Sequence, residues 1–226
     1  MTLYLKQGKL RRARQMIQTA LTGYEEILGP DDLSTISTAG NLGVVYQEQG
    51  KLDKAEQTYQ RALAGTEKRF GPDHPNTLEI VNNLGGLYRD QGKRSDAEKM
   101  WQRALAGFEK ALGPGHTDTI GAVENIGVLL GDQGKLEEAE QMLQHALAGF
   151  LEVFGPNHPS TTRVLETLGN LYYDQRRLDE AKQMYQRALS GHEKSIGLSG
   201  PRVAILSRKI RFVGMLEGKS PIVSQY

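Results

Sequence analysis

A Gly-Pro pair recurs along this chain with a constant spacing of 42 residues, and this period restricts the fold more than any other feature. Other glycines follow the same period, as does an Ala-Leu pair that appears at Ala104 and again at Ala146. A period of this length indicates a repeat architecture, in which each unit packs against its neighbours. The 26 glycines of a chain otherwise rich in helix-forming residues are therefore fixed positions of the repeated unit. The Gly-Pro pairs begin at Gly29, Gly71, Gly113 and Gly155, and Gly197 follows with Leu198 in place of proline.

Each unit is predicted to contain two antiparallel helices. In the second full unit the apolar residues from Leu78 to Tyr88 are three and four positions apart, which predicts a helix from about Asn76 to Asp90. Gly92 follows it, where a left-handed helix terminus is easily formed. A second apolar stripe runs to Leu112 and ends at Gly113-Pro114, because proline cannot continue a helix. We therefore predict an all-α fold, a right-handed superhelical solenoid of antiparallel helix pairs.

The period divides the chain into segments of one continuous solenoid domain. The first segment is expected to be incomplete, because Met1 falls in the middle of its first helix, and the last one is degenerate and basic. In the last segment a terminal helix is expected to cover the apolar face of the fourth full unit with Ile205, Leu206, Ile210, Phe212 and Val213. The predicted boundaries are a partial first repeat at 1–28, repeats at 29–70, 71–112, 113–154 and 155–196, and a C-terminal capping segment at 197–226.

The order Leu84-Gly85, Tyr88, Ala97, Trp101 and Ala104 resembles the signature of the tetratricopeptide repeat. The unit is longer than the usual ~34 residues, and its extra residues form a G-P-x-H-P-x-T linker. This long unit resembles the repeats of kinesin light chains and of the C-terminal arrays of fungal NACHT or NB-ARC receptors. The coiled coil of the former and the nucleotide-binding domain of the latter have no match within these 226 residues. The resemblance implies a protein–protein interaction scaffold or adaptor; the alternatives are the sensor portion of a fungal receptor and a self-assembling structural solenoid.

In tetratricopeptide arrays the first helix of each unit lines a concave groove, which implies that residues outside its core stripe contact the partner. Asn41, Asn83 and Asn125 occupy one column of the repeat, and Thr167 follows in the fourth unit. Because an asparagine amide both donates and accepts hydrogen bonds, such a ladder can pair with the backbone of an extended peptide. Similar asparagines have this role in peptide-binding relatives, and the alternative is that Asn is merely tolerated on a helix surface. The other predicted groove residues are Glu79, Asn82, Arg89, Glu124, Arg163, Asn170 and Tyr173.

The charges of the predicted groove argue against one specificity that the resemblance suggests. Kinesin light chain grooves take peptides with a tryptophan flanked by acids, which requires basic groove residues. In this chain Arg89 and Arg163 are accompanied by Glu79, Glu124 and Glu166. The sequence therefore favours a peptide groove without favouring acidic cargo.

No pattern of residues indicates catalysis, a metal or a cofactor. The chain has 0 cysteines, which excludes disulfides and thiolate metal sites. His74, His116 and His158 occur one per linker, so neighbours would lie ~10 Å or more apart, and we expect them to bond nearby backbone instead of a metal. Gly218-Lys219-Ser220 resembles the end of a phosphate-binding loop, but Val213 stands where that loop requires glycine. Acid pairs recur once per unit, whereas catalysis needs a unique constellation. We predict that the chain is not an enzyme.

Charge and hydropathy favour a protein partner in the cytoplasm. Lys and Arg number 28 against 27 Asp and Glu, so no overall field attracts nucleic acid or an acidic membrane. Neither a signal peptide nor a membrane span is recognisable. A second hypothesis is end-to-end self-association, because the incomplete first unit would leave some apolar residues partly covered. These residues are Leu3, Leu5, Leu10, Ile17 and Leu21.

Overall fold

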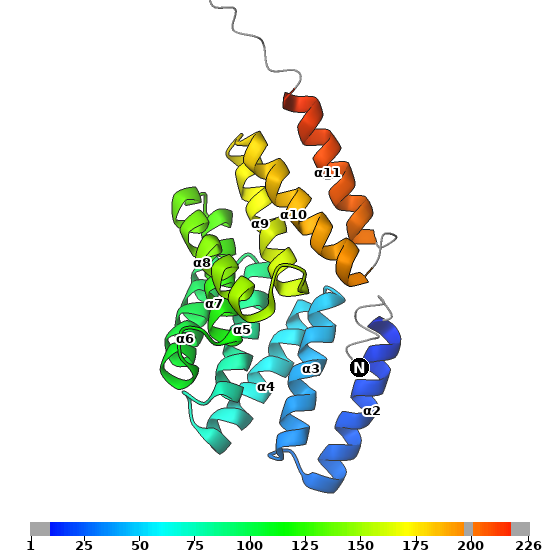
Figure 1. Cartoon of the computed structure of the whole chain (residues 1–226). Helices are drawn as coiled ribbons and strands as arrows, with labels where there is room; N and C mark the ends of the chain where they lie inside the picture. Colours follow the sequence, from blue (N-terminus) through cyan, green and yellow to red (C-terminus); the bar gives the residue numbers. More distant parts are fainter. Residues whose placement is uncertain (1–9, 197–200, 218–226) are drawn as a thin grey trace, which may run out of the picture. The chain divides into compact units, whose positions relative to one another are not determined.

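The computed structural model describes residues 10–196 and 201–217, and this part of the chain consists of ten α-helices without a strand (Figure 1). The chain divides into two compact units, residues 1–122 and 123–226, with the boundary inside α7. We call the odd-numbered helices from α3 to α11 first helices and the even-numbered ones second helices. The bounds are α2 Leu10–Leu28, α3 Leu33–Glu48, α4 Leu52–Phe70, α5 Pro75–Asp90, α6 Arg94–Leu112, α7 Thr117–Asp132, α8 Leu136–Phe154, α9 Pro159–Asp174, α10 Leu178–Ile196 and α11 Pro201–Glu217.

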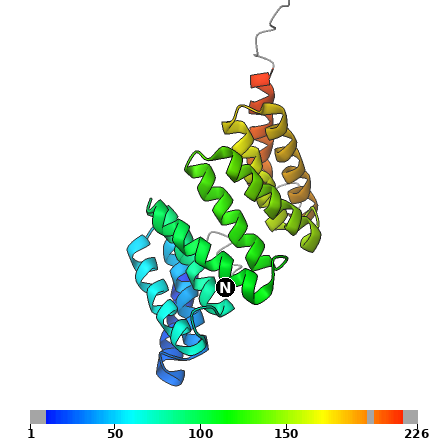
Figure 2. The same ribbon diagram turned by 90° about the vertical axis from the view of Figure 1, so that its left-hand side faces the viewer.

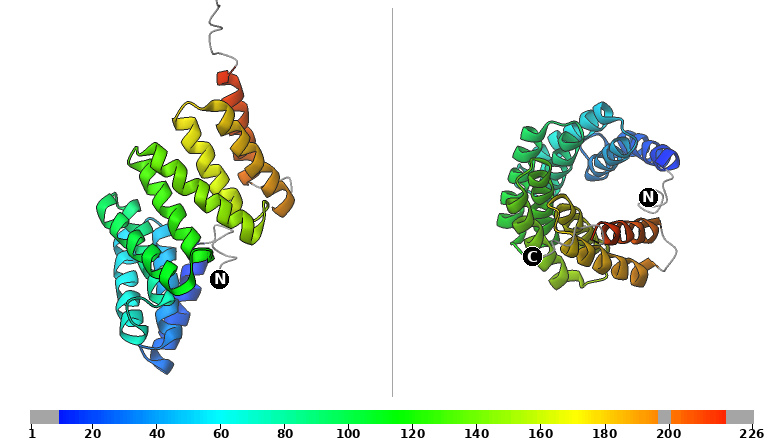
Figure 3. Two further views of the ribbon diagram at one scale, coloured as in Figure 1. Left: turned by 60° about the vertical axis from the view of Figure 1, so that its left-hand side comes forward. Right: turned by 90° about the horizontal axis from the view of Figure 1, so that it is seen from above.

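The helices pack with their neighbours along the chain. Within the first unit α2, α3, α4, α5 and α6 make successive contacts, and Figure 3 shows α2 to α4 side by side in blue to cyan. Within the second unit α8 contacts α9, α9 contacts α10, and α10 contacts α11, and the last three lie side by side in yellow to red in Figure 2. The helix predicted from Asn76 to Asp90 is α5, which begins one residue earlier at Pro75. The helix-pair architecture expected from the period is thus confirmed.

The linkers before α3, α5, α7 and α9 are closed by hydrogen bonds at the same two positions, and the second acceptor is Asp32 before α3 and a histidine before the other three helices. A threonine hydroxyl donates to the carbonyl oxygen of the glycine six residues earlier, and the Oγ1–O distance is 2.8 Å in all four linkers, from Thr35, Thr77, Thr119 and Thr161. The histidine before the first helix accepts a hydrogen bond from a backbone N–H of the first turn, for example His74 Nδ1 from Asn76 at 3.1 Å. His116 and His158 do the same at 3.3 and 3.2 Å. The prediction that these histidines bond nearby backbone is confirmed.

The turn between the two helices of a unit depends on a residue in the left-handed conformation. Gly92 has a φ of 75°, as the sequence predicts. In the fourth full unit Arg176 holds the equivalent position with a φ of 64°, which a side chain rarely adopts. The turn is therefore maintained by the packing of the flanking helices even where glycine is absent.

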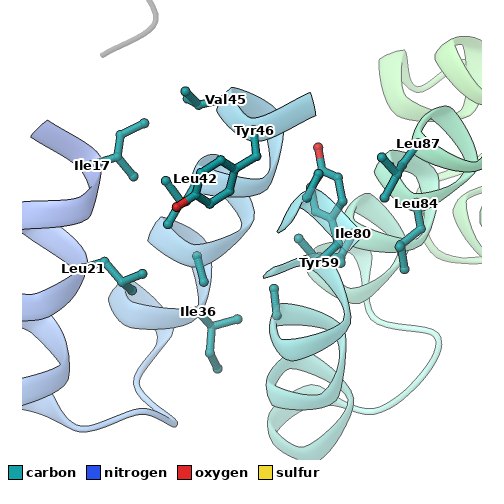
Figure 4. Packing of buried hydrophobic residues seen from close by; sticks show 13 residues of the cluster. Ile17, Leu21, Ile36, Leu42, Val45, Tyr46, Tyr59, Ile80, Leu84 and Leu87 are labelled. Atoms are coloured by element: carbon teal, nitrogen blue, oxygen red, sulfur yellow. The ribbon is translucent and has the colours of Figure 1, made fainter. Parts of the chain in front are cut away.

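The core of the first unit is continuous from α2 to α5 (Figure 4). Ile17 and Leu21 of α2 face Leu42 of α3, and Tyr59 of α4 packs with Leu84 of α5 in the same cluster. Ile17 is 1% and Leu21 is 7% exposed, which corrects the expectation that they are only partly covered. Leu3 and Leu5, which belonged to the same expectation, lie outside the described residues. A single helix pair has too little apolar surface to be stable alone, so this sharing of core between neighbours is what holds the array together.

In α3, α5, α7 and α9 a glycine lies against a large side chain of the second helix that follows. A Cβ atom placed on Gly85 would lie 2.6 Å from the ring of Trp101, and the same distance separates Gly43 from Tyr59 and Gly169 from Tyr185. The Trp101 ring cannot withdraw easily, because it is 2% exposed and its Nε1 donates to the carbonyl oxygen of Asn82 at 3.0 Å. The two helices therefore approach more closely than any side chain at this position would allow.

This contact predicts opposite effects for two adjacent substitutions. Gly85→Ala should lower the free energy of unfolding by about 1–3 kcal/mol, because the new methyl group overpacks against Trp101. Gly86→Ala should be neutral or raise it by about 0.5–1 kcal/mol, since alanine is the better helix former and the nearest atom is 3.7 Å away. Urea denaturation followed by circular dichroism measures both. Equal stability of the two variants would contradict the assignment of Gly85 as a close-packing position.

The terminal helix predicted from the last segment is present as α11, but it buries only some of the residues that were expected to cover the core. Leu206 and Val213 are 0% and 1% exposed, as expected, whereas Ile205 and Phe212 are 50% and 52% exposed. The reason is that α11 has the register of a first helix, with Pro201 one period after Pro159. Its buried stripe therefore faces the preceding helix α10, and Ile205 and Phe212 lie on another face.

Candidate functional site

Four positions of every first helix are exposed or half-buried throughout the array, although the positions beside them form the core. In α5, for example, Asn83 lies directly before the buried Leu84 and two residues after the buried Val81. We call the set of these positions the ladder face. It comprises Ser37, Asn41, Val44 and Gln47 in α3; Glu79, Asn83, Gly86 and Arg89 in α5; Gly121, Asn125, Val128 and Gly131 in α7; Arg163, Thr167, Asn170 and Tyr173 in α9; and Ile205, Lys209, Phe212 and Met215 in α11.

In the first unit most side chains of the ladder face are polar, and Gln47 is fixed by hydrogen bonds to neighbouring helices. Asn41 is exposed and Asn83 is half-buried. Gln47 links three helices, because its Nε2 donates to Asp90 Oδ2 of α5 at 2.7 Å and its Oε1 accepts from Tyr59 Oη of α4 at 3.1 Å. Burial raises the pKa of Tyr59, and the nearby carboxylate of Asp90 raises it further, so the phenol remains a donor. The tyrosine that packs against Gly43 thus also orients a ladder-face side chain.

Two residues predicted for the groove do not lie on the ladder face. Asn82 and Glu124 occupy the column on the side of the second helices, where the carbonyl oxygen of Asn82 accepts the hydrogen bond from Trp101. Glu124 is only 1% exposed, so its carboxylate is not presented to a partner, which corrects its assignment to the groove surface. Asn82 is half-buried, as Asn83 is, so its assignment to the groove stays a prediction.

Glu124 is instead paired with another predicted groove residue. Its Oε2 lies 2.8 Å from a guanidinium nitrogen of Arg163 in α9, whose side chain is 51% exposed. Burial raises the pKa of Glu124 to about 7, and Arg163 acts in the opposite direction. Burial prevails because the single cation beside the carboxylate is itself half in water, where its field is screened. Arg163 therefore joins α9 to α7.

The equivalent carboxylate one period later makes a similar link that the sequence did not predict. Glu166 of α9 is 8% exposed, and its Oε1 lies 2.8 Å from His192 Nε2 of α10. Its other oxygen, Oε2, accepts from Arg202 of α11, also at 2.8 Å. The sequence signal that could have predicted this link is the spacing of 42 residues between Glu124 and Glu166. These bonds attach α11 to the last full repeat.

Two further predicted residues, Asn170 and Tyr173, meet at a cavity of about 300 Å³ between α9, α10 and α11. Asn170 Oδ1 accepts hydrogen bonds from Tyr185 Oη at 2.8 Å and from Lys209 Nζ at 2.6 Å. The remaining wall is apolar, and its Tyr173 and Phe212 rings have centroids 6.2 Å apart. Sequence reasoning missed Lys209 and Phe212, although they lie one period after Thr167 and Asn170. The lining consists of Asn170, Tyr173, Tyr185, Lys209, Phe212 and Val213.

The described residues include no group of three or more His, Asp or Glu side chains that could hold a metal ion. Among the helices of that part of the chain, none is long and apolar enough to cross a membrane. Gly218-Lys219-Ser220 lies outside the described residues. The side chains of the ladder face can donate and accept hydrogen bonds and offer apolar contacts.

Comparison with known proteins places the chain in a family. The sequence profile of the tetratricopeptide repeat matches residues 2–68, 41–110, 78–148 and 119–194. Because these matches span most of the sequence, the chain belongs to the tetratricopeptide repeat family. The repeats of this family form protein–protein interaction scaffolds that are generally not catalytic. No curated protein matches the chain significantly.

Solved structures show the same fold. BtubC (BKLC) from P. vanneervenii is similar with a TM-score of 0.75 and 21% identity, over 92% of this chain and 84% of that one. A Podosopora anserina protein described as a kinesin light chain with nearly identical TPR-like repeats is similar with a TM-score of 0.62 and 18% identity, over 86% of this chain and 92% of that one. A variant of that Podosopora anserina protein gives a TM-score of 0.64 at the same identity and coverage. The all-α solenoid fold and the resemblance to kinesin light chain-like repeats are thereby confirmed.

The buried carboxylate of Glu124 predicts a pH dependence of stability. Its pKa is about 7 in the folded state against an ordinary value of 4.5, so its contribution to stability is complete below about pH 4.5 and is lost as the pH rises through 7. Glu124→Gln stays neutral at every pH. The free energy of unfolding of this variant, relative to the parent, should therefore rise by about 2–3 kcal/mol between pH 5 and pH 8.

Urea denaturation at a series of pH values measures this difference, and Glu152→Gln, at an exposed position of the neighbouring helix α8, is the control. Parallel pH profiles for the parent and Glu124→Gln would show that the carboxylate is solvated.

Proposed function

We propose that the chain is a scaffold that binds an extended segment of a partner protein along the ladder face, in the manner of a kinesin light chain-like adaptor. One observation carries this proposal. The ladder face stays out of the core in every first helix, and three consecutive first helices have asparagine at the same position, namely Asn41, Asn83 and Asn125. Because Asn41 and Asn83 share this position within the first unit, the polar column suits a ligand that contacts neighbouring repeats.

The spacing of the asparagines suits the backbone of an extended peptide. Asn41 and Asn83 belong to α3 and α5, which contact each other within the first unit. Packed helices lie about 8–10 Å apart, and an extended chain rises about 3.3 Å per residue. One asparagine would then meet about every third residue of the peptide, and its amide can donate to a carbonyl oxygen or accept from an N–H. Binding through the backbone would leave the choice of sequence to the variable positions.

The variable positions of the ladder face supply mixed charge. Glu79 and Arg89 are on α5, and Arg163 on α9 is already paired with Glu124. This pairing reduces the positive charge that a partner would meet and supports the expectation that acidic cargo is not selected along the whole face. The absence of cysteine from the sequence fits the cytoplasm, where we place the scaffold. The same surface would serve equally as the sensor portion of a larger fungal receptor.

Replacement of two asparagines tests the proposal. Peptides selected from a displayed random library on the full chain serve as ligands, and fluorescence anisotropy measures their affinity. Asn41→Ala combined with Asn83→Ala should weaken binding about tenfold, because two hydrogen bonds of about 0.5–1.5 kcal/mol each are lost. The control combines Gln57→Ala with Gln141→Ala, at exposed positions of the second helices α4 and α8. The proposal fails if both double variants bind the peptides as the parent does.

Self-association is a second candidate, supported by the exposed apolar side chains of α2. Tyr24 is 40% exposed, whereas Phe108 at the equivalent position of α6 is 2% exposed. Ile27 and Leu28 are 79% and 48% exposed beside it. We infer that a second copy of the chain could cover this surface.

Multi-angle light scattering over a concentration series tests the second candidate. The apparent mass should rise with concentration for the parent and fall towards the monomer for Ile27→Ser with Leu28→Ser. A constant monomer mass for the parent would exclude this candidate without affecting the first.

A further inference from the structure

One ion pair occurs at the same repeat position in both units, where it joins neighbouring repeats. Glu56 Oε2 of α4 lies 3.4 Å from Lys93 Nζ, just before α6, and it also accepts a hydrogen bond from Gln91 Nε2 at 2.8 Å. Glu140 Oε2 of α8 lies 2.5 Å from a guanidinium nitrogen of Arg177, just before α10. Each pair connects the first turns of one second helix to the turn that precedes the next one.

At α2 both positions of this ion pair are occupied by cations. Arg14 stands one period before Glu56, and Lys51 stands one period before Lys93. The two helices concerned still pack in the same order, because α2 contacts α3 and α3 leads into Lys51. Two like charges therefore approach each other where the later repeats have opposite charges. Such an arrangement is unfavourable unless an anion lies between the two cations.

Two further cations belong to the same place. Desolvation lowers the pKa of the Lys51 ammonium, and the positive charges of Arg14, Lys54 and Arg11 lower it further. The charged groups that act on Lys51 are thus all cations, and they come from both α2 and α4. We call Arg11, Arg14, Lys51 and Lys54 the cation cluster. Arg14 is half-buried, and the other three side chains are exposed to solvent.

Packing holds the cation cluster in place. Gln49 Nε2 donates to the carbonyl oxygen of Leu10 at 3.2 Å, which fixes the start of α2 beside the turn between α3 and α4. Lys54 Nζ lies 5.9 Å from the centroid of the Tyr46 ring. The Nε atom of Arg14 is buried and has no hydrogen-bond acceptor among the described residues. Because a buried donor without an acceptor costs stability, this guanidinium is suited to a ligand that supplies oxygen atoms.

The carboxylates around the cation cluster are fewer than its cations. Asp53 lies in the first turn of α4, and Glu48 is the last residue of α3, and both are exposed. Glu25 and Glu26 of α2 lie three turns beyond the cluster, about 16 Å along the helix axis, and Glu25 is paired with Arg61 of α4 at 2.6 Å. Even if both nearby carboxylates are counted, four cations exceed them by two charges.

A phosphoryl group matches this excess better than a carboxylate does. In the later repeats one carboxylate balances one cation, as in the pair of Glu140 and Arg177. A phosphoryl group carries about −1.5 to −2 charges at pH 7 and has three acceptor oxygens. A guanidinium binds it through two parallel N–H···O bonds, and an ammonium binds it as a point charge. Two arginines and two lysines therefore provide both kinds of contact.

We propose that the cation cluster binds a phosphorylated serine or threonine side chain of a partner protein. A protein is the favoured source of the phosphoryl group, because the repeats of this family form protein–protein interaction scaffolds. Arg11 and Arg14 also line a hollow of about 740 Å³ along α2, whose other described lining residues are an arginine, two glutamines and two threonines. This hollow offers space for the residues that flank the modified side chain. The inference goes beyond the proposed function, since the cluster contains no residue of the ladder face.

Three synthetic Gly/Ser-rich peptides of equal length test the site. The first has one phosphoserine, the second has serine at that position, and the third has aspartate. Each is titrated into the ¹⁵N-labelled full chain, and amide shifts are followed in ¹H–¹⁵N correlation spectra. The first peptide should shift the amides of Arg11, Arg14, Lys51 and Lys54. The other two should bind at least about tenfold more weakly, because each lacks charge-assisted hydrogen bonds that the phosphoryl group makes.

Arg14→Glu is the decisive variant, because glutamate occupies this position in the next three repeats. It should form the ion pair with Lys51 that the later repeats have, raise the urea concentration at the midpoint of unfolding, and abolish binding of the phosphopeptide. Loss of binding together with higher stability distinguishes the loss of a site from a loss of fold. The control, Lys99→Gln, removes an exposed positive charge from α6 and should leave the affinity unchanged.

Several results would overturn the site. Equal affinity for the aspartate peptide would show that the cluster attracts any anion, and unchanged binding by Arg14→Glu would place the phosphopeptide elsewhere on the chain. Inorganic phosphate that binds as tightly as the phosphopeptide would assign the site to a free ion instead of a partner protein. Asn41→Ala combined with Asn83→Ala should bind the phosphopeptide as the parent does, so the site and the proposed function can fail separately.

Discussion

In three of the four full repeats a glycine of the first helix lies against an aromatic ring of the second helix at a distance that no side chain on the first helix would permit. The ring of Trp101 lies 2.6 Å from where a Cβ of Gly85 would be. The aromatic residue at this position also contacts the ladder face, because Tyr59 donates a hydrogen bond to Gln47 and Tyr185 donates one to Asn170. The contact that sets the separation of the helices therefore also orients the polar side chains available to a partner.

Between repeats, buried carboxylates add a second kind of link. Glu124 and Glu166 lie one period apart, and each is paired with an arginine of the next first helix, Arg163 and Arg202 respectively. An arginine beside a buried carboxylate lowers the cost of burying it when it is ionised, because an uncompensated charge in the interior is destabilising. The arginines are consequently occupied in holding successive repeats, and this lowers the positive charge that the ladder face of α9 offers to acidic ligands.

The terminal helix combines two roles that the sequence alone does not separate. Leu206 and Val213 extend the core against α10, where both side chains are buried. The adjacent side of α11 carries Phe212 and Lys209 beside a cavity shared with α9 and α10. A helix in the register of a first helix can do both, because its core stripe and its ladder stripe lie on different sides.

Much of the fold could be predicted from periodicity. The 42-residue spacing defined the helix pairs, the boundaries of α5 to within one residue, and the backbone role of the linker histidines. These features depend on local conformation and on contacts that recur in every repeat. They can therefore be predicted from a regular spacing in the sequence. The asparagine column was likewise visible, because the side of a helix on which a residue lies follows from its position in the repeat.

Only the tertiary structure decided which polar residues form contacts inside the molecule and which remain available to a partner. The spacing placed Glu124 near the ladder column, and only the packing of α7 with α9 buried it beside Arg163. The sequence pattern also assigned Phe212 to the core, whereas the register of α11 leaves the Phe212 side chain half exposed to water. The physical reason is that burial and pairing depend on distances between helices roughly one repeat apart in sequence. By itself the sequence determined the repeat, its helices and the column of asparagines. The packing of the helices determined the cavity and placed the Lys209 ammonium in its wall.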